Sequence, residues 1–343
     1  MSLILLIGAT ALVMTQALPA NAQKYSDWST PVNLGSPINS TSSDQGPAIS
    51  KDGLTLYFHS NRPGGLGGFD MYVSHRASVA DAWGSPVNLG STVNTTFDEG
   101  NPAFSRDEHF LFFQSIRPGG LGGVDLWVAY REHTHDDFDW QTPVNLGAGV
   151  NSTSDDNAPS YLENDEVGSA QLYFVSTRPG GLGGQDIYLS NQFPDGSFGP
   201  AALVAELSSP STDSRPSIRH DGREIFFQSN RPGSLGPALD LWVATRNSIF
   251  DGWSAPVNLG NTINTTSIEN NANLSSDRLT LFFSSDRAGG LGGLDLYVST
   301  RTKLRGQSGK LGDSRFTVTK QATEITPMRC RNEEPKRAYS PTR

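Results

Sequence analysis

Residues 62–70, with the sequence RPGGLGGFD, combine an arginine, four glycines and a final aspartate, a set that could hold a phosphate. The arginine would supply positive charge, and the glycines would let backbone amides approach the ligand. Such a site also needs a helix N-terminus or a nest of free amides, and no helical pattern follows. We therefore predict a hairpin turn, in which the glycines take positive φ and Pro63 sets the first corner.

The same stretch occurs four more times, which argues against a single catalytic role. In each copy the arginine should end one strand and the acid should begin the next, so that the two charges can pair across the base of the hairpin. The five predicted pairs are Arg62–Asp70, Arg117–Asp125, Arg178–Asp186, Arg231–Asp240 and Arg287–Asp295.

A second set of acids recurs in the same repeat, three residues before a proline or, in one unit, before Ala272. If the strands that follow line a central channel, five carboxylates would surround its mouth and could attract a cation or a basic segment of a partner. The alternative, which we favour, is that a nearby arginine neutralises each acid or that the acid caps its own turn. These acids are Asp44, Glu99, Asp156, Asp213 and Glu269.

Catalytic groups should break the repeat, because a reaction needs each of them once. The segment 131–140 does so, and its His133, His135 and Asp136 could bind zinc or copper. A solvated charged loop is the simpler interpretation, so we predict no metal site and no cofactor. One unit has Phe198 where four have tryptophan, a pattern that fits rim packing better than repeated sugar sites.

The elements that must position these residues follow from the repeat itself. Its arginines lie 55, 61, 53 and 56 residues apart, a period that suits one four-stranded sheet per unit. The two central strands of each unit are apolar almost throughout, which indicates burial on both faces. Residues 28–35 match the fourth strand but precede the first unit, and the last unit lacks a fourth strand. We predict an all-β, five-bladed β-propeller of four-stranded antiparallel blades, closed by this N-terminal strand in the last blade.

The unit PAISKDGLTLYFHSNRPGGLGGFDMYVS resembles the WD40-like β-propeller repeat of TolB-type bacterial envelope proteins. The resemblance rests on a proline, a serine, an Asp-Gly turn, an apolar strand, Ser-x-Arg, and an Asp before hydrophobic and aromatic residues; it covers about residues 28–301. It implies an envelope or secreted location and protein-binding roles. We therefore predict a non-enzymatic scaffold for a protein or envelope ligand, bound on the face with the glycine loops. The alternative is a carbohydrate-active propeller, a lectin or a glycoside hydrolase, that uses the channel-mouth carboxylates.

Composition sets the remaining limits. Residues 1–22 have the pattern of a bacterial-type signal peptide, so we predict a secreted or periplasmic protein with its propeller at 23–301. A basic, disordered tail should follow at 302–343. It carries ten Lys/Arg against four Asp/Glu, a charge of about +6, so the residues before it carry about −15 of charge and the whole chain −9. That acidic body is a poor match for nucleic acid.

The partner and the assembly are the last expectations. We expect no membrane span in the mature chain, because no other segment is apolar over a sufficient length. Cys330 is the single cysteine, so no internal disulfide can form. We expect a monomer whose partner is another envelope or secreted protein, or a glycan.

Overall fold

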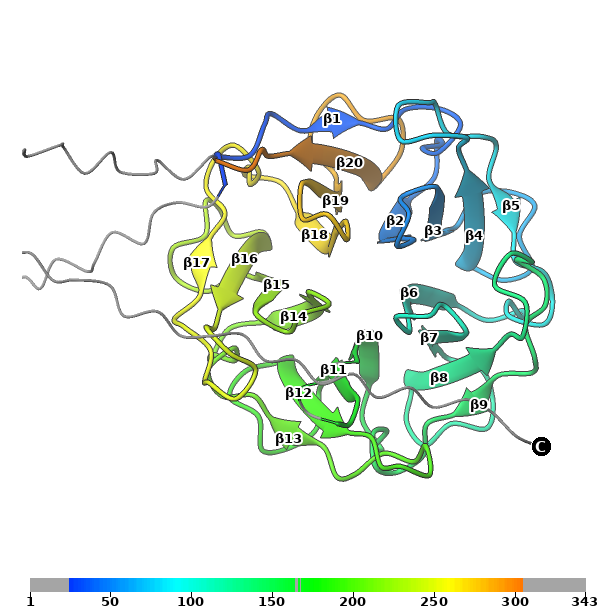
Figure 1. Ribbon diagram of the computed structural model, residues 1–343, viewed down its shortest axis with the longest axis vertical. Coiled ribbons are helices and arrows are strands. Elements are labelled where there is room, and N and C mark those ends of the chain that lie inside the picture. The colour runs from blue at the N-terminus through cyan, green and yellow to red at the C-terminus, as the bar shows by residue number, and fades with distance from the viewer. Residues whose placement is uncertain (1–24, 164–165, 167, 305–343) are drawn as a thin grey trace, which may run out of the picture. The chain divides into compact units, whose positions relative to one another are not determined.

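The computed structural model describes residues 25–163, 166 and 168–304 of the 343-residue chain. These residues form a five-bladed β-propeller of five four-stranded antiparallel sheets, which confirms the predicted fold class (Figure 1). The predicted signal peptide, and the predicted tail from residue 305 onward, lie outside the described residues. No helix among the described residues has the length and apolar character needed to cross a membrane.

Each blade runs from a strand beside the channel (strand a) through strands b and c to a short strand at the rim (strand d). Blade 1 contains β2 (Asp44–Ile49), β3 (Thr55–Ser60), β4 (Asp70–His75) and β5 (Val87–Asn88). Blade 2 contains β6 (Glu99–Phe104), β7 (Phe110–Ser115), β8 (Asp125–Tyr130) and β9 (Val144–Asn145). Blade 3 contains β10 (Asp156–Leu162), β11 (Gln171–Ser176), β12 (Asp186–Asn191) and β13 (Ala202–Leu203). Blade 4 contains β14 (Asp213–Ile218), β15 (Glu224–Ser229), β16 (Asp240–Thr245) and β17 (Val257–Asn258). Blade 5 contains β18 (Glu269–Leu274), β19 (Thr280–Ser285), β20 (Asp295–Thr300) and, from the other end of the chain, β1 (Val32–Asn33).

The pairing of β1 with β20 closes the ring, as predicted. The two strands are antiparallel, with Val32 opposite Val298 (Figure 1). The contact continues beyond the strands, where the Ser26 amide donates to the Thr302 carbonyl at 2.9 Å. The N-terminal segment therefore supplies the d strand that blade 5 lacks.

The central strands are apolar because neighbouring blades cover both of their faces. In blade 1, Leu56, Phe58 and Met71 are completely buried, and the other blades repeat the pattern. Burying these side chains between sheets supplies the main stabilising free energy of the fold.

The glycine loops join strands b and c, and they pack against the d–a connection that enters the next blade. A Cβ atom added to Gly67 would lie 1.9 Å from the carbonyl oxygen of Phe97 in that connection. The same approach recurs at Gly292, whose added Cβ would lie 1.8 Å from the Ser42 carbonyl oxygen. Only glycine permits so close a backbone contact. The RPGGLGG loops are therefore turns whose backbone packs closely against the connection to the next blade.

Candidate functional site

The arginine of each glycine loop pairs with a different acid from the one predicted. Arg62 Nη2 contacts Asp44 Oδ1 at 2.5 Å, whereas Asp70 accepts the backbone amides of Leu66 and Gly67. The loop folds around its own aspartate, so that carboxylate is already satisfied and the guanidinium turns to strand a. The loop acids of the other blades, Asp125, Asp186, Asp240 and Asp295, likewise accept amides of their own loops.

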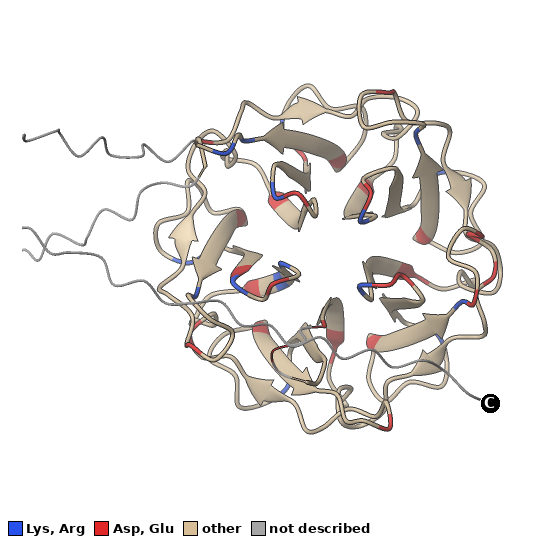
Figure 2. Cartoon of the chain, viewed as in Figure 1, with Lys and Arg blue, Asp and Glu red and all other residues tan. Residues whose placement is uncertain are grey.

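All five acids predicted for the channel mouth are buried in such ion pairs. Figure 2 shows acidic residues at the ends of the strands. The remaining pairs are Arg117–Glu99 (3.1 Å), Arg178–Asp156 (2.6 Å), Arg231–Asp213 (2.5 Å) and Arg287–Glu269 (3.0 Å). Burial raises the pKa of Glu269, opposed by hydrogen bonds from Thr265 and by the charge of Arg287. These carboxylates are thus enclosed between strands and do not form an open ring around the channel.

The predicted metal candidates lie together in the exposed loop after β8. His133 Nδ1 contacts Asp139 Oδ2 at 2.8 Å, and this hydrogen bond raises the pKa of His133. The ring of His135 stands edge-on to that of His133, with centres 5.8 Å apart, and Asp136 accepts a backbone amide of its own turn. No group of three or more His, Cys, Asp or Glu side chains suited to a metal ion occurs among the described residues.

The contact that this loop makes with blade 1 was not predicted from the sequence. Asp137 extends to blade 1, where its Oδ1 accepts a hydrogen bond from the Tyr57 hydroxyl at 2.6 Å and its Oδ2 contacts His75 Nε2 at 2.5 Å. Arg131, at 3.5 Å from Asp137, completes the group. The loop therefore covers the space between blades 1 and 2.

The central channel is narrow, and its described wall carries no acid. A cavity of about 50 Å³ lies between the five a strands, and Arg215 lines it. His59 lies behind the same wall, where the backbone N–H of Asn101 donates a hydrogen bond to its Nδ1 at 3.2 Å. Burial, and then the charge of Arg215, lower the pKa of His59 to about 3.

The buried histidine makes the stability depend on pH. In the unfolded chain His59 binds a proton below about pH 6.5, whereas in the folded protein it stays neutral down to about pH 3. The unfolded state thus binds more protons in this window, so stability should fall by about 1.4 kcal/mol per pH unit as the pH drops below 6.5. The change His59→Gln, which places there the residue found in blades 2 and 4, should flatten this slope in urea unfolding between pH 4 and 7. The exposed His135→Gln is the control, and an unchanged slope in His59→Gln would contradict the assignment.

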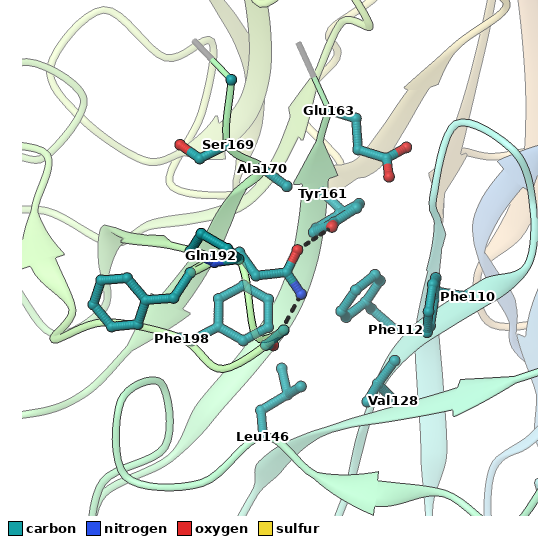
Figure 3. A pocket seen from close by; sticks show the side chains of 14 residues that line it. Phe110, Phe112, Val128, Leu146, Tyr161, Glu163, Ser169, Ala170, Gln192 and Phe198 are labelled. Carbon is teal, nitrogen blue, oxygen red and sulfur yellow. Dashed lines mark hydrogen bonds between the residues drawn. The ribbon is translucent and has the colours of Figure 1, made fainter. Parts of the chain in front are cut away.

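An aromatic pocket of about 730 Å³ lies between blades 2 and 3, on the face opposite the glycine loops (Figure 3). Phe110 and Phe112 form one wall, and Tyr161 faces them from strand a of blade 3. The rings of Phe112 and Tyr161 are stacked with centres 4.3 Å apart. Polar groups lie at the rim and include Glu163. We refer to this cavity as the blade 2–3 pocket.

The blade 2–3 pocket occurs where the repeat is broken. In four blades an arginine after strand c stacks on the tryptophan of the following d segment. These pairs are Arg76–Trp83 (4.3 Å), Arg131–Trp140 (4.5 Å), Arg246–Trp253 (4.2 Å) and Arg301–Trp28 (4.5 Å). Blade 3 has Gln192 and Phe198 instead, and the Tyr161 hydroxyl donates to Gln192 Oε1 at 2.6 Å. The loss of this pair leaves an aromatic wall uncovered.

Sequence reasoning found one half of this exception. Phe198 stands out beside the four tryptophans, whereas Gln192 is not among the predicted site residues. Aligning the residue after each strand c would have shown glutamine against four arginines. Phe110 also has a sequence signal, because the first residue of strand b is polar in the other four units and phenylalanine in this one.

A similar cavity of about 550 Å³ lies between blades 5 and 1. It contains Arg76 stacked on Trp83, and Lys51 and Thr280 occupy the positions of Glu163 and Phe110. This second cavity is lined by two cations and two acids, Lys51, Arg76, Asp52 and Asp277, where the blade 2–3 pocket has one carboxylate and more aromatic side chains.

Comparison with known proteins shows the fold but no family. No protein-family model and no curated protein matches the chain. An α-L-arabinofuranosidase from Podospora anserina, solved with cellotriose, matches with a TM-score of 0.54 at 11% identity over 82% of this chain and 97% of that one. A GH62 α-L-arabinofuranosidase catalytic domain from Coprinopsis cinerea matches with 0.53 at 12% identity, over 81% and 98%. A Bacillus subtilis arabinanase matches with 0.52 at 12% identity, over 81% and 99%.

These matches correct our main functional prediction. The non-enzymatic scaffold for a protein or envelope ligand depended on the resemblance to TolB-type propellers. A putative TolB from Agrobacterium tumefaciens matches with a TM-score of 0.43, which is too low to carry an argument, while the better matches are carbohydrate-active enzymes. At these identities the likeness establishes the five-bladed propeller and leaves the activity to the site.

Proposed function

We propose that this protein binds carbohydrate in the blade 2–3 pocket. The observation that carries the proposal is a cavity lined by aromatic side chains and by polar residues, among them Glu163, Ser169 and Gln192. The apolar C–H faces of a sugar ring pack against aromatic rings, and its hydroxyl groups need hydrogen-bond partners when they leave water. A volume of about 730 Å³ is within the usual range for small-molecule sites.

The neighbouring propellers support a glycan as the ligand. Two of the solved structures contain cellotriose and xylotriose. The proposal keeps the carbohydrate alternative of the sequence analysis but changes its location. The acids expected at the channel mouth are buried in ion pairs, whereas the blade 2–3 pocket is open to solvent at its rim.

We limit the proposal to binding. Glycoside hydrolysis uses two carboxyl groups, about 5–5.5 Å apart in retaining enzymes and about 6.5–9.5 Å apart in inverting ones. Among the described residues that line the blade 2–3 pocket, Glu163 supplies the one carboxylate. Its role would be to accept hydrogen bonds from sugar hydroxyls.

The proposed cellular location of the chain and its proposed family relationship rest on the sequence alone. The apolar pattern of residues 1–22 supports export from the cytoplasm, where glycans of the cell surface or the medium would be met. The repeat unit supports a relationship to WD40-like propellers of the TolB type.

The test is to rebuild in blade 3 the pair that the other blades have. The double change Gln192→Arg with Phe198→Trp should place an arginine–tryptophan stack across the pocket and lower affinity for xylotriose or cellotriose at least tenfold. Glu163→Gln should weaken binding less, because an amide still accepts hydrogen bonds. Calorimetric titration with both trisaccharides measures these effects.

The reciprocal change supplies the matched control. Arg76→Gln with Trp83→Phe alters the same two positions in blade 1 and should leave the affinity unchanged. Equal binding by the blade 3 variant and the wild type would remove the pocket from consideration. Release of reducing sugar by the wild type, lost in Glu163→Gln, would show catalysis and replace the binding proposal.

A further inference from the structure

Arg215 occupies a position in strand a where no other blade has a charged residue. Its equivalents are Gly46, Asn101, Ala158 and Asn271, and all five residues have positive φ, between 50° and 67°. Arg215 Nη1 donates to Asn271 Oδ1 at 2.6 Å and to Asn101 Oδ1 at 3.2 Å. These contacts direct the guanidinium into the central channel.

The guanidinium of Arg215 has no counter-charge among the described residues. The arginines of all five glycine loops have a carboxylate within 3.1 Å, whereas Arg215 has amide oxygens only. Burial lowers the pKa of Arg215 to about 10, so the side chain still carries its charge at neutral pH. Arg215 is half-buried, and a charge withdrawn from water without a partner is costly, so a bound ion of opposite sign would offset that cost.

A second donor beside Arg215 also lacks an acceptor. Asn271 is 8% exposed, and its Nδ2 makes no hydrogen bond although its Oδ1 accepts from Arg215. Asn271 lines the same cavity. A cation and a free N–H group on one cavity wall are the chemistry that an anion requires.

The cavity allows only a small ligand. Its volume is about 50 Å³, and prolines from four a strands, which have no N–H to donate, form part of its wall. A volume of this size holds a few water-sized groups, far fewer than a sugar or a nucleotide.

We propose that the central channel binds a small monovalent anion, a halide or a carboxylate, through Arg215 and Asn271. The anion would neutralise the axis of the propeller and stabilise the closed ring. This site is separate from the blade 2–3 pocket and does not depend on the proposed sugar binding.

Thermal unfolding at constant ionic strength tests the proposal. Sodium gluconate, whose anion is too large for the cavity, serves as the background and is replaced stepwise by bromide or by formate. The melting temperature of the wild type should rise in a saturable manner by about 5 °C. Bromide and formate in separate series distinguish a halide from a carboxylate ligand.

Two variants decide whether the rise comes from the channel. Arg215→Ala, which places there the residue of blade 3, should abolish the rise, while Arg278→Ala, at an arginine outside the channel lining, should keep it. An equal rise in Arg215→Ala would overturn the proposal. If that variant does not fold, crystals of the wild type soaked in bromide decide. An anomalous bromide peak beside Arg215, or formate density there in crystals soaked in formate, supports the site, and a channel empty in both soaks overturns it.

Discussion

Replacing Asp156 with alanine should lower the free energy of unfolding by about 3–5 kcal/mol. Asp156 is fully buried and lies 2.6 Å from Arg178 Nη2. It also accepts hydrogen bonds from the Ser152 amide at 2.6 Å and from the Ser152 hydroxyl at 2.8 Å. Truncation leaves the Arg178 guanidinium without its counter-charge and the Ser152 amide without an acceptor, which costs more than the pair itself contributes. Urea unfolding of the variant and the wild type measures the difference.

Two further variants separate this effect from a general loss of charge. Glu166→Ala removes one partner of the exposed Arg223–Glu166 pair (3.4 Å), so it should cost less than about 1 kcal/mol. The double change Asp156→Ala with Arg178→Leu should recover part of the loss, because no unpaired charge remains. A cost below about 1 kcal/mol for Asp156→Ala would mean that the five ion pairs do not stabilise the blades.

Deleting the N-terminal strand should have the second large effect. A chain of residues 36–304 lacks β1, so β20 would expose unpaired N–H and C=O groups along its length. It would also lose the stack of Trp28 on Arg301 and the packing of Trp28 against the core between blades 4 and 5. We expect this chain to aggregate or dimerise through blade 5, whereas residues 25–304 remain a folded monomer. Light scattering after size-exclusion chromatography measures the difference.

A circular permutation provides the control for this deletion. Tyr25 bridges to Lys303, so a short linker can join residue 304 to residue 25. A chain that starts at Ser36 and carries residues 25–35 after this linker should fold as a monomer. If the deleted chain is as stable as the parent, the closure by β1 is not needed for the ring.

The fold could be predicted from sequence because its determinants are local and repeated. Five copies of one unit specify five blades, and the position of the extra strand before the first unit specifies the closure. The continuous apolar runs of the central strands predict burial on both faces, as in Leu56 and Phe58.

The charged pairs could be only half predicted. The arginine and both acids of each repeat are evident in the sequence, but Asp44 and Asp70 both lie opposite Ser60 in the strand register. Which acid receives the guanidinium depends on the loop amides that fold around Asp70. That choice is made by three-dimensional packing of the loop and has no counterpart in residue spacing.

The sequence by itself determined the number of blades, the strand order and the N-terminal closure, since hydrophobic period and repeat length are properties of the chain. Only the tertiary structure decided where the cavities lie. The blade 2–3 pocket and the Arg215 channel each combine side chains from different blades. Their cavities are set by the volume that neighbouring blades leave unfilled, a quantity that no single repeat contains.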